Sequence, residues 1–284
     1  MTREPAATHR IGHVSDSHFT GSGLLHDRVP VADTFATALD ALAASGVPLD
    51  AVVHTGDVAD EGEAAAYVAA RELLAAAVER TGWRMLTVPG NHDDRAAMRE
   101  HLLGLPPSAE PIDEVVDVQG LRIVLLDSSI PRRVEGGIDA EQLDRVHEVL
   151  REPAEHGTVL ALHHPPVPVE VTGLQRLHLT GQERLAAAIE GGDVRAVLGG
   201  HLHYATTSMF AGVPVFVAPA TAYTIALRGP GGGVAGLDGG RAVGVLTCYD
   251  DGRVGYSLLP AGREQVLSTT PDAAFDGMGV DVER

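Results

Sequence analysis

Residues 10–18 read Arg-Ile-Gly-His-Val-Ser-Asp-Ser-His, a short apolar run that ends in an Asp-x-His pair. Residues 51–57, Ala-Val-Val-His-Thr-Gly-Asp, show the same kind of junction, because a second apolar run ends in Gly-Asp. Between them, Val31–Ala44 carries apolar residues at helical spacing. Two apolar runs separated by a helix predict a β-α-β unit at the start of an α/β domain.

The same alternation continues to about residue 198. Helices are expected at Glu63–Glu79, Ala140–Leu150 and Gln182–Ile189. Strands are expected at Arg84–Val88, Val115–Val118, Leu121–Leu126, Thr158–Leu162 and Val194–Leu198, and then, with no helices between them, at Thr206–Phe210, Val213–Val217, Ala242–Tyr249 and Val254–Leu259. This order predicts an α/β fold of two packed mixed β-sheets flanked by helices, a four-layer αββα sandwich.

The chain has 284 residues, of which 44% are hydrophobic, enough for one large core. We expect a single catalytic domain over residues 1–265 and a polar C-terminal tail over 266–284. Gly229–Gly240 has too few side chains to pack and is expected to be a mobile loop. Residues 1–10 lack the apolar stretch of a signal peptide, and no run reaches the roughly 18 apolar residues of a membrane span, so a cytoplasmic location is expected.

Charge and residue usage exclude several functions. The formal net charge of −18 disfavours binding to a nucleic acid polymer or to an anionic membrane. All 21 basic residues are arginine, so a lysine Schiff base and a P-loop lysine are both impossible. The one cysteine, Cys248, cannot form an intramolecular disulfide and is expected to be a buried apolar side chain.

Side chains suited to metal binding follow the predicted strands in five short clusters. The seven are Asp16, His18, Asp57, Asn91, His163, His201 and His203. Loops at the carboxyl ends of strands converge on one crevice, so these groups are expected to meet. Carboxylate, imidazole and amide ligands suit manganese, iron, zinc or cobalt, and two such ions can activate a bridging water and hold both oxygens of a displacement.

The five blocks together resemble the calcineurin-like metallophosphoesterase signature. They are Asp16-x-His18, Gly56-Asp57-x-x-Asp60, Gly90-Asn91-His92-Asp93, His163-x-Pro165 and Gly200-His201-x-His203. The residues around these blocks are most similar to those of class III cyclic nucleotide phosphodiesterases. The resemblance implies that one metal ion takes Asp16, His18, Asp57 and His203, and that the other takes Asp57, Asn91, His163 and His201. It also implies that His92 assists the leaving group and that Asp60 orients His92.

For function, the resemblance implies hydrolysis of a small phosphodiester, most of all 3',5'-cyclic nucleotides such as cAMP, to nucleoside monophosphates by in-line attack of a metal-bridging hydroxide. It also suggests a homodimer. One alternative is a phosphodiesterase or phosphatase for glycerophosphodiesters or other small phosphate esters. Another is a metal-containing module that senses nucleotides without hydrolysing them.

Several further residues have two interpretations each. Histidines at strand ends are more often core groups or supports of metal ligands than ligands; these are His13, His54, His164 and His178. Asp93 and Asp94 are expected to cap a helix N-terminus. Arg95 and Arg228 are either phosphate contacts or solvated side chains. Tyr204 and Tyr223 are candidates for stacking on a base.

Overall fold

The computed structural model describes residues 3–169, 174–229 and 233–262. The expected tail over 266–284 and the expected domain boundary at 265 lie outside these residues. The helices are α1 (Val31–Ala44), α2 (Ala64–Thr81), α3 (Arg95–Ala97), the π-helical segment η1 (Met98–Leu103), α4 (Ala140–Leu150), the short 3-10 turn η2 (Gln175–Leu177) and α5 (Gln182–Ile189).

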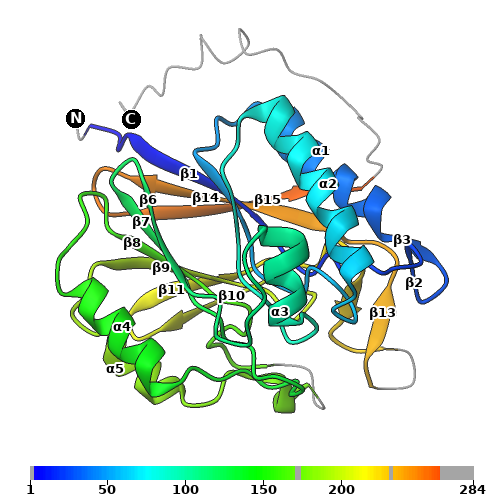
Figure 1. Cartoon of the computed structure of the whole chain (residues 1–284). Helices are drawn as coiled ribbons and strands as arrows, with labels where there is room; N and C mark the ends of the chain where they lie inside the picture. The colour runs from blue at the N-terminus through cyan, green and yellow to red at the C-terminus, as the bar shows by residue number, and fades with distance from the viewer. Residues whose placement is uncertain (1–2, 170–173, 230–232, 263–284) are drawn as a thin grey trace, which may run out of the picture.

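Two sheets form the centre of the molecule (Figure 1). The first has the strand order β15 (Val254–Pro260), β14 (Ala242–Tyr249), β1 (Ala7–Val14), β4 (Ala51–His54), β5 (Met85–Thr87). The second has the order β10 (Thr206–Phe210), β11 (Val213–Val217), β9 (Val194–Gly199), β8 (Thr158–Ala161), β7 (Leu121–Leu125), β6 (Glu114–Val118). Both sheets are mixed. In the first, β1, β4 and β5 are parallel, and β14 and β15 add antiparallel pairs on the other side of β1. In the second, the central strands are parallel and an antiparallel hairpin lies at each edge.

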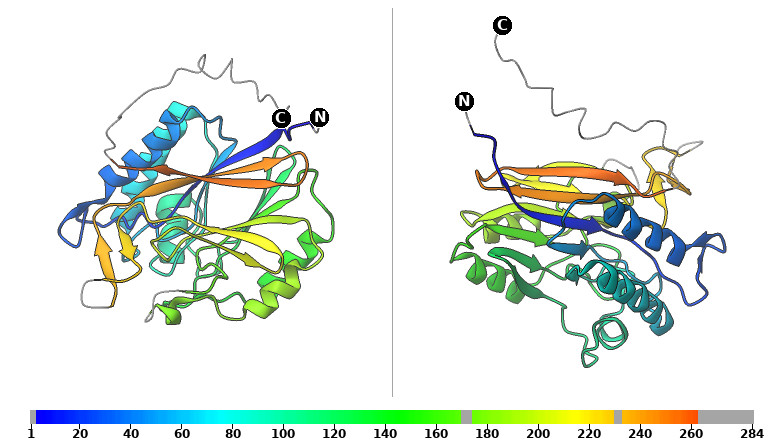
Figure 2. Two further views of the ribbon diagram at one scale, coloured as in Figure 1. Left: turned by 180° about the vertical axis from the view of Figure 1, so that it is seen from behind. Right: turned by 90° about the horizontal axis from the view of Figure 1, so that it is seen from above.

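The sheets are packed face to face, and helices cover both outer faces (Figure 2). Successive residues of a strand point to opposite faces. Val52 accordingly packs in one core with α1 and α2, whereas Val53 belongs to a second core that includes Ile123 of the second sheet. A third core joins the other face of the second sheet to α4 and α5. Three apolar layers between four structural layers confirm the predicted αββα sandwich.

One local expectation was wrong. Within the glycine-rich segment Gly229–Gly240, Ala235–Leu237 form strand β13, which pairs antiparallel with β12 (Thr224–Ala226). The Thr224 hydroxyl also donates to the carbonyl of Gly239. Backbone hydrogen bonds need no large side chains, so Ala235–Leu237 pair with β12 despite the composition around them, whereas residues 230–232 lie outside the described residues. A further small hairpin, β2 (Leu24–Leu25) with β3 (Val29–Pro30), was not predicted.

Candidate metal centre

The loops that follow β1, β4, β5, β8 and β9 meet at the carboxyl ends of these strands. Backbone hydrogen bonds join them: the Asp16 amide donates to the carbonyl of Gly56 at 3.0 Å, and the Gly200 amide donates to the carbonyl of His163 at 3.0 Å. The His92 amide donates to Asp57 Oδ1 at 2.9 Å. The seven predicted side chains, separated by up to 187 positions in the sequence, are therefore brought to one place.

The backbone of this region is unusual. Left-handed φ values occur at Asp16 (53°), His18 (46°), Asp57 (52°), His201 (70°) and His203 (58°). Each such non-glycine residue costs on the order of 1–3 kcal/mol and persists only where the surrounding structure holds it. Five of the seven predicted side chains thus have their direction set by strained backbone, a feature that is concentrated at functional sites.

Two glycines of the motifs are required by close packing. A Cβ atom at Gly90 would overlap Asp57 Oδ1, and a Cβ atom at Gly200 would overlap the Ser15 hydroxyl and approach Asp16 Oδ2. The glycine before Asn91 and the glycine before His201 therefore allow two loops to approach the two carboxylates.

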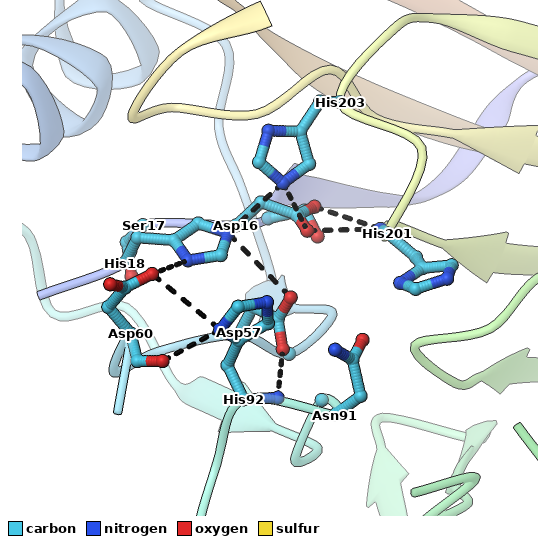
Figure 3. Close-up of polar contacts among 12 residues, drawn as sticks. Asp16, Ser17, His18, Asp57, Asp60, Asn91, His92, His201 and His203 are labelled. Carbon is cyan, nitrogen blue, oxygen red and sulfur yellow. Dashed lines mark hydrogen bonds and ion pairs between the residues drawn. The ribbon is translucent and has the colours of Figure 1, made fainter. Parts of the chain in front are cut away.

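One group of ligand atoms consists of Asp16, His18, Asp57 and His203, all buried. His18 Nε2 lies 3.0 Å from His203 Nε2. Asp57 Oδ2 lies 3.6 Å from His18 Nε2, and Asp16 Oδ1 lies 3.4 Å from His203 Nε2. Two carboxylates and two ring nitrogens thus surround one small volume (Figure 3).

A second group lies beside the first. His163 Nε2 is 3.1 Å from His201 Nδ1, 3.2 Å from Asn91 Oδ1 and 3.3 Å from Asp57 Oδ2. The same Asp57 oxygen therefore contacts both groups. This is the geometry needed of a carboxylate that bridges two cations.

The outer nitrogen of each of the four histidine rings is bound to an oxygen acceptor. His18 Nδ1 lies 2.9 Å from Asp60 Oδ1, and His203 Nδ1 lies 2.9 Å from the carbonyl oxygen of Tyr223. A carboxylate or carbonyl oxygen only accepts, so these nitrogens carry the hydrogen and the neutral ring turns a lone pair inward.

The second group has the same arrangement. His163 Nδ1 donates to the carbonyl of Thr55 at 2.7 Å, and His201 Nε2 donates to the carbonyl of Leu177 at 2.7 Å. Each site thus contains two facing ring nitrogens about 3 Å apart whose lone pairs repel unless a cation lies between them. This donor set fits a pair of metal ions, and orienting hydrogen bonds of this kind are typical of histidines that bind metal.

Electrostatics supports the same conclusion. Burial lowers the pKa of His163, but the charge of Asp57 and a hydrogen bond to it outweigh burial and raise that pKa to about 9. Burial opposes the charge on Asp57 too, yet His163 and His18 hold its pKa well below the usual value. Burial, assisted by His163, lowers the pKa of His201 to about 3. In the metal-free protein, one ring of this pair holds a proton where a cation would otherwise lie.

In the first group too, one histidine has a raised pKa and its neighbour has a lowered pKa. Burial lowers the pKa of His18, but its hydrogen bond to Asp60 and the charge of Asp57 produce a net increase. Burial and the neighbouring His18 hold the pKa of His203 well below the usual value. Burial raises the pKa of Asp16 to about 6, against the opposing charge of His163.

His92 lies at the rim of the site, with 40% of its side chain exposed and its ring 4.8 Å from that of His18. It contacts Asp60, the expected residue, but mainly through the main chain. His92 Nδ1 donates to the backbone carbonyl of Asp60 at 2.7 Å, while the Asp60 carboxylate is 3.6 Å away and makes its short contact with His18 (Figure 3). Asp60 therefore orients both rings, with its main chain for His92 and its side chain for His18.

Four other histidines are placed outside the two groups or beside them. His13 contacts the hydroxyls of Tyr256 and Thr55, and His54 contacts Ser17 and accepts from the Gly56 amide. His178 contacts the carbonyl of its own turn, at Gln175.

His164 lies within reach of His163 and His201, and these three form a further cluster of ligand atoms. However, His164 Nδ1 lies 2.9 Å from Ser128 Oγ. His163, and not His164, contacts Asp57 and Asn91, so the geometry favours His163 of the two neighbours.

The two aspartates after His92 have different tasks. Asp94 caps α3 by accepting from the amide of Ala97, as expected. Asp93 does not cap it. Its buried carboxylate accepts from the amides of Val58, Ala59 and Gly90 and from the Tyr67 hydroxyl, so it joins the two loops that carry Asp57 and Asn91.

Of the remaining candidates for contact with a base or a phosphate, the structure places one tyrosine beside the metal centre. Tyr223 lies beside the site, with ring centroids 4.5 Å from His203 and 6.1 Å from His18. Tyr204 packs against the third core, and Arg228 is exposed. Arg95 is paired with buried Asp127 at 2.8 Å and is a structural cation.

Sequence reasoning did not identify the groups that orient the rings. The carbonyls of Thr55, Leu177 and Tyr223 belong to the backbone, and no residue type marks them. Only the side chain of Asp60 had a signal in its motif, and that signal pointed to a different ring.

The family follows from a comparison with protein-family models. The calcineurin-like phosphoesterase model matches residues 9–205, which include all seven predicted metal-binding side chains. The chain belongs to the calcineurin-like phosphoesterase family. Membership confirms the resemblance proposed from the five motifs and the prediction of a metal-dependent phosphoesterase.

Curated relatives within this phosphoesterase group cover most of the chain. A "cAMP/cGMP dual specificity phosphodiesterase" of Mycobacterium tuberculosis is 42% identical over 258 residues, 90% of this chain and 81% of the relative. A protein of Rhodococcus erythropolis named "Probable cyclic nucleotide phosphodiesterase" is 39% identical over 269 residues, 95% of this chain and 89% of the relative. A glycerophosphodiester phosphodiesterase of Enterobacter lignolyticus is 26% identical over 221 residues, 76% of this chain and 78% of the relative.

Among solved structures, a dimetal phosphatase of Danio rerio is similar in fold, with a TM-score of 0.64 over 90% of this chain and 98% of the other. The two sequences are 14% identical, so the likeness concerns the phosphoesterase fold alone. Within the part of the chain that the structure describes, we find no helix with the length and hydropathy of a membrane span.

Proposed function

We propose that this phosphoesterase hydrolyses 3',5'-cyclic nucleotides to nucleoside monophosphates with two metal ions bound. One ion is held by Asp16, His18, Asp57 and His203. The other is held by Asp57, Asn91, His163 and His201. Oxygen and imidazole donors without thiolates suit manganese, iron, zinc or cobalt. We also propose that residues 1–265 form one catalytic domain.

The observation that carries this proposal is the pair of facing ring nitrogens in each group. Fixing four imidazoles with their outer hydrogens bound to oxygen acceptors, two by two at 3.0 and 3.1 Å, is unfavourable unless a proton or a metal ion lies between the rings of each pair. Left-handed backbone at five of the seven residues adds a further cost. Binding of two cations offsets both costs.

When bound, the two ions supply a nucleophilic water at neutral pH and neutralise charge on the phosphoryl oxygens. The chain itself supplies the rest. Asp57 is held in place by the His92 amide, which fixes the separation of the two sites. His92 is exposed at the rim with Nδ1 bound to a carbonyl, so its Nε2 is available to carry a proton to the leaving alkoxide.

Three features support a small diester as the substrate. The net charge of −18 disfavours a polymeric polyanion. The cyclic nucleotide named for two relatives at 39% and 42% identity supports that class in particular. A glycerophosphodiester is the second candidate, because the relative named for that substrate shares 26% identity over 76% of the chain.

The test is a substrate panel on protein whose two metals have been quantified. Manganese-loaded protein is expected to hydrolyse 3',5'-cyclic AMP and 3',5'-cyclic GMP faster than glycerophosphoethanolamine. An Asp57→Ala preparation serves as the control for contaminating activity. Intact cyclic nucleotides, with rates equal to those of this control, would rule the proposal out. Tight cyclic nucleotide binding without turnover would indicate a sensor instead.

A further inference from the structure

A pocket of about 510 Å³ extends from the rim of the site. Its lining includes Asn91 and His92 at the metal centre and also the loop residues Ile130, Pro131 and Arg132. A volume of this size is in the range of small-molecule sites. Because His92 lines it, a group attached to the leaving oxygen would lie in this pocket.

Arg132 is a cation of this pocket for which the described residues supply no partner. Within residues 3–169, 174–229 and 233–262, its side chain makes no hydrogen bond or ion pair. The neighbouring cations are occupied: Arg95 is paired with Asp127 at 2.8 Å, and Arg133 is paired with Glu135 at 2.8 Å. In a chain with 39 acidic and 21 basic residues, an unpaired arginine beside a phosphodiester site is a candidate ligand contact.

The loop that carries Arg132 is held in a defined shape. Arg132 has a left-handed φ of 65°, which is uncommon for a residue with a side chain. The Arg133 amide donates to the carbonyl of Ile130, and the Gly137 amide donates to the carbonyl of Ser128. Arg95 Nη2 donates to the carbonyl of Ser129 at 2.8 Å and so connects this loop to α3, which begins three residues after His92.

The charge balance of the pocket favours a base over a second phosphate. Asp94 lines the same pocket and uses only Oδ1 for the helix cap. Arg95 is neutralised by Asp127. Arg132 therefore does not create the excess positive charge that a second phosphate requires. A base with two adjacent hydrogen-bond acceptors and two adjacent donors would suit the pocket better, because the acceptors match Arg132 and the donors match Asp94.

We infer that this pocket binds the base of the nucleotide and that Arg132 selects guanine over adenine. Guanine presents the adjacent acceptors O6 and N7, which match the two donors of a guanidinium, and its N1–H and N2–H groups can donate to Asp94 Oδ2. Adenine replaces the O6 acceptor with an amino group and loses that bidentate contact. The inference rests on the proposed hydrolysis of cyclic nucleotides and names the residue that sets the preference within that class.

The experiment compares kcat/KM for cyclic GMP and cyclic AMP in the metal-loaded wild type, Arg132→Ala, Arg132→Lys and the matched control Arg133→Ala. The wild type is expected to prefer cyclic GMP. Arg132→Ala should lower the cyclic GMP to cyclic AMP ratio by about tenfold, since the pocket is open and the pair is not fully desolvated. The ratio for Arg132→Lys should lie between those of the wild type and Arg132→Ala, and Arg133→Ala should keep the wild-type ratio.

Hydrolysis of bis(4-nitrophenyl) phosphate, which lacks a base, reports the metal centre and is expected to be unchanged in all four proteins. An unchanged ratio in Arg132→Ala, or an equal loss on all three substrates, would overturn the role of Arg132 and leave the proposed function standing. A wild type that hydrolyses bis(4-nitrophenyl) phosphate but neither cyclic nucleotide would refute the proposed function and this inference together.

Discussion

Substitution of Asp57 by asparagine changes the proton affinity of His163 in the metal-free protein. The two side chains are buried, and His163 Nε2 lies 3.3 Å from Asp57 Oδ2. At an effective dielectric constant of about 20, charges at this distance attract by about 5 kcal/mol. A pKa of about 9 instead of 6.5 corresponds to a net stabilisation of the protonated ring by roughly 3 kcal/mol. Burial of His163, which disfavours its charged form, offsets the rest of the attraction.

In Asp57→Asn, burial acts without this attraction. We therefore expect the pKa of His163 to fall below 6.5, so that the ring is neutral at pH 7. The assay is an NMR titration of the imidazole nitrogens of the metal-free protein, with the exposed substitution Asp40→Asn as the control. If His163 already titrates near 6.5 in the wild type, or is unaffected by Asp57→Asn, the reasoning is refuted.

The interaction of His163 with Asp57 also determines how the stability of the metal-free protein and its metal affinity change with pH. The folded-state pKa of His163 lies above its unfolded value, so its contribution to stability is fully present below pH 6.5 and is lost as pH rises through about 9. A metal ion needs the neutral ring, so binding of a metal displaces this proton. Metal affinity should therefore increase with pH up to about 9.

Three further substitutions test other parts of the site. His92→Ala should retain both metal ions and lower kcat by about 10² to 10⁴-fold, because only the proton donor is lost; loss of metal in this variant would contradict its assignment. Asp60→Asn should weaken metal binding by about 10 to 100-fold, since the carboxylate orients His18; metal competition measures the change, and an unaltered affinity with a reduced kcat would instead favour a role through His92 alone. Gly90→Ala should displace Asp57 and reduce metal content, as measured by elemental analysis, and full occupancy would show that the loop can move away.

Much of the fold was predictable because its signals are local. The expected ranges Val31–Ala44, Ala140–Leu150 and Gln182–Ile189 agree with the observed helices, since their apolar spacing and their ends are visible in the sequence. The ribbon at Ala235–Leu237 was missed because its three residues carry little strand signal of their own and are held by backbone pairing with Thr224–Ala226. Composition alone cannot reveal such pairing.

The candidate site was predictable to a similar degree. The side chains that meet at the strand ends carry a strong motif signal, and all seven converge. The orientation of each ring was not predictable, because it depends on backbone carbonyls such as that of Leu177. Asp93 was misassigned as a cap for a similar reason: two of its three amide donors, Val58 and Ala59, belong to a loop that is distant in sequence.

The most direct test of the central claim is a crystal structure of manganese-soaked protein with anomalous difference density measured above the manganese edge. Two peaks per chain are expected, one between His18 and His203 and the other between His163 and His201, with Asp57 in contact with both. A single peak, or two peaks that do not share Asp57, would contradict the account.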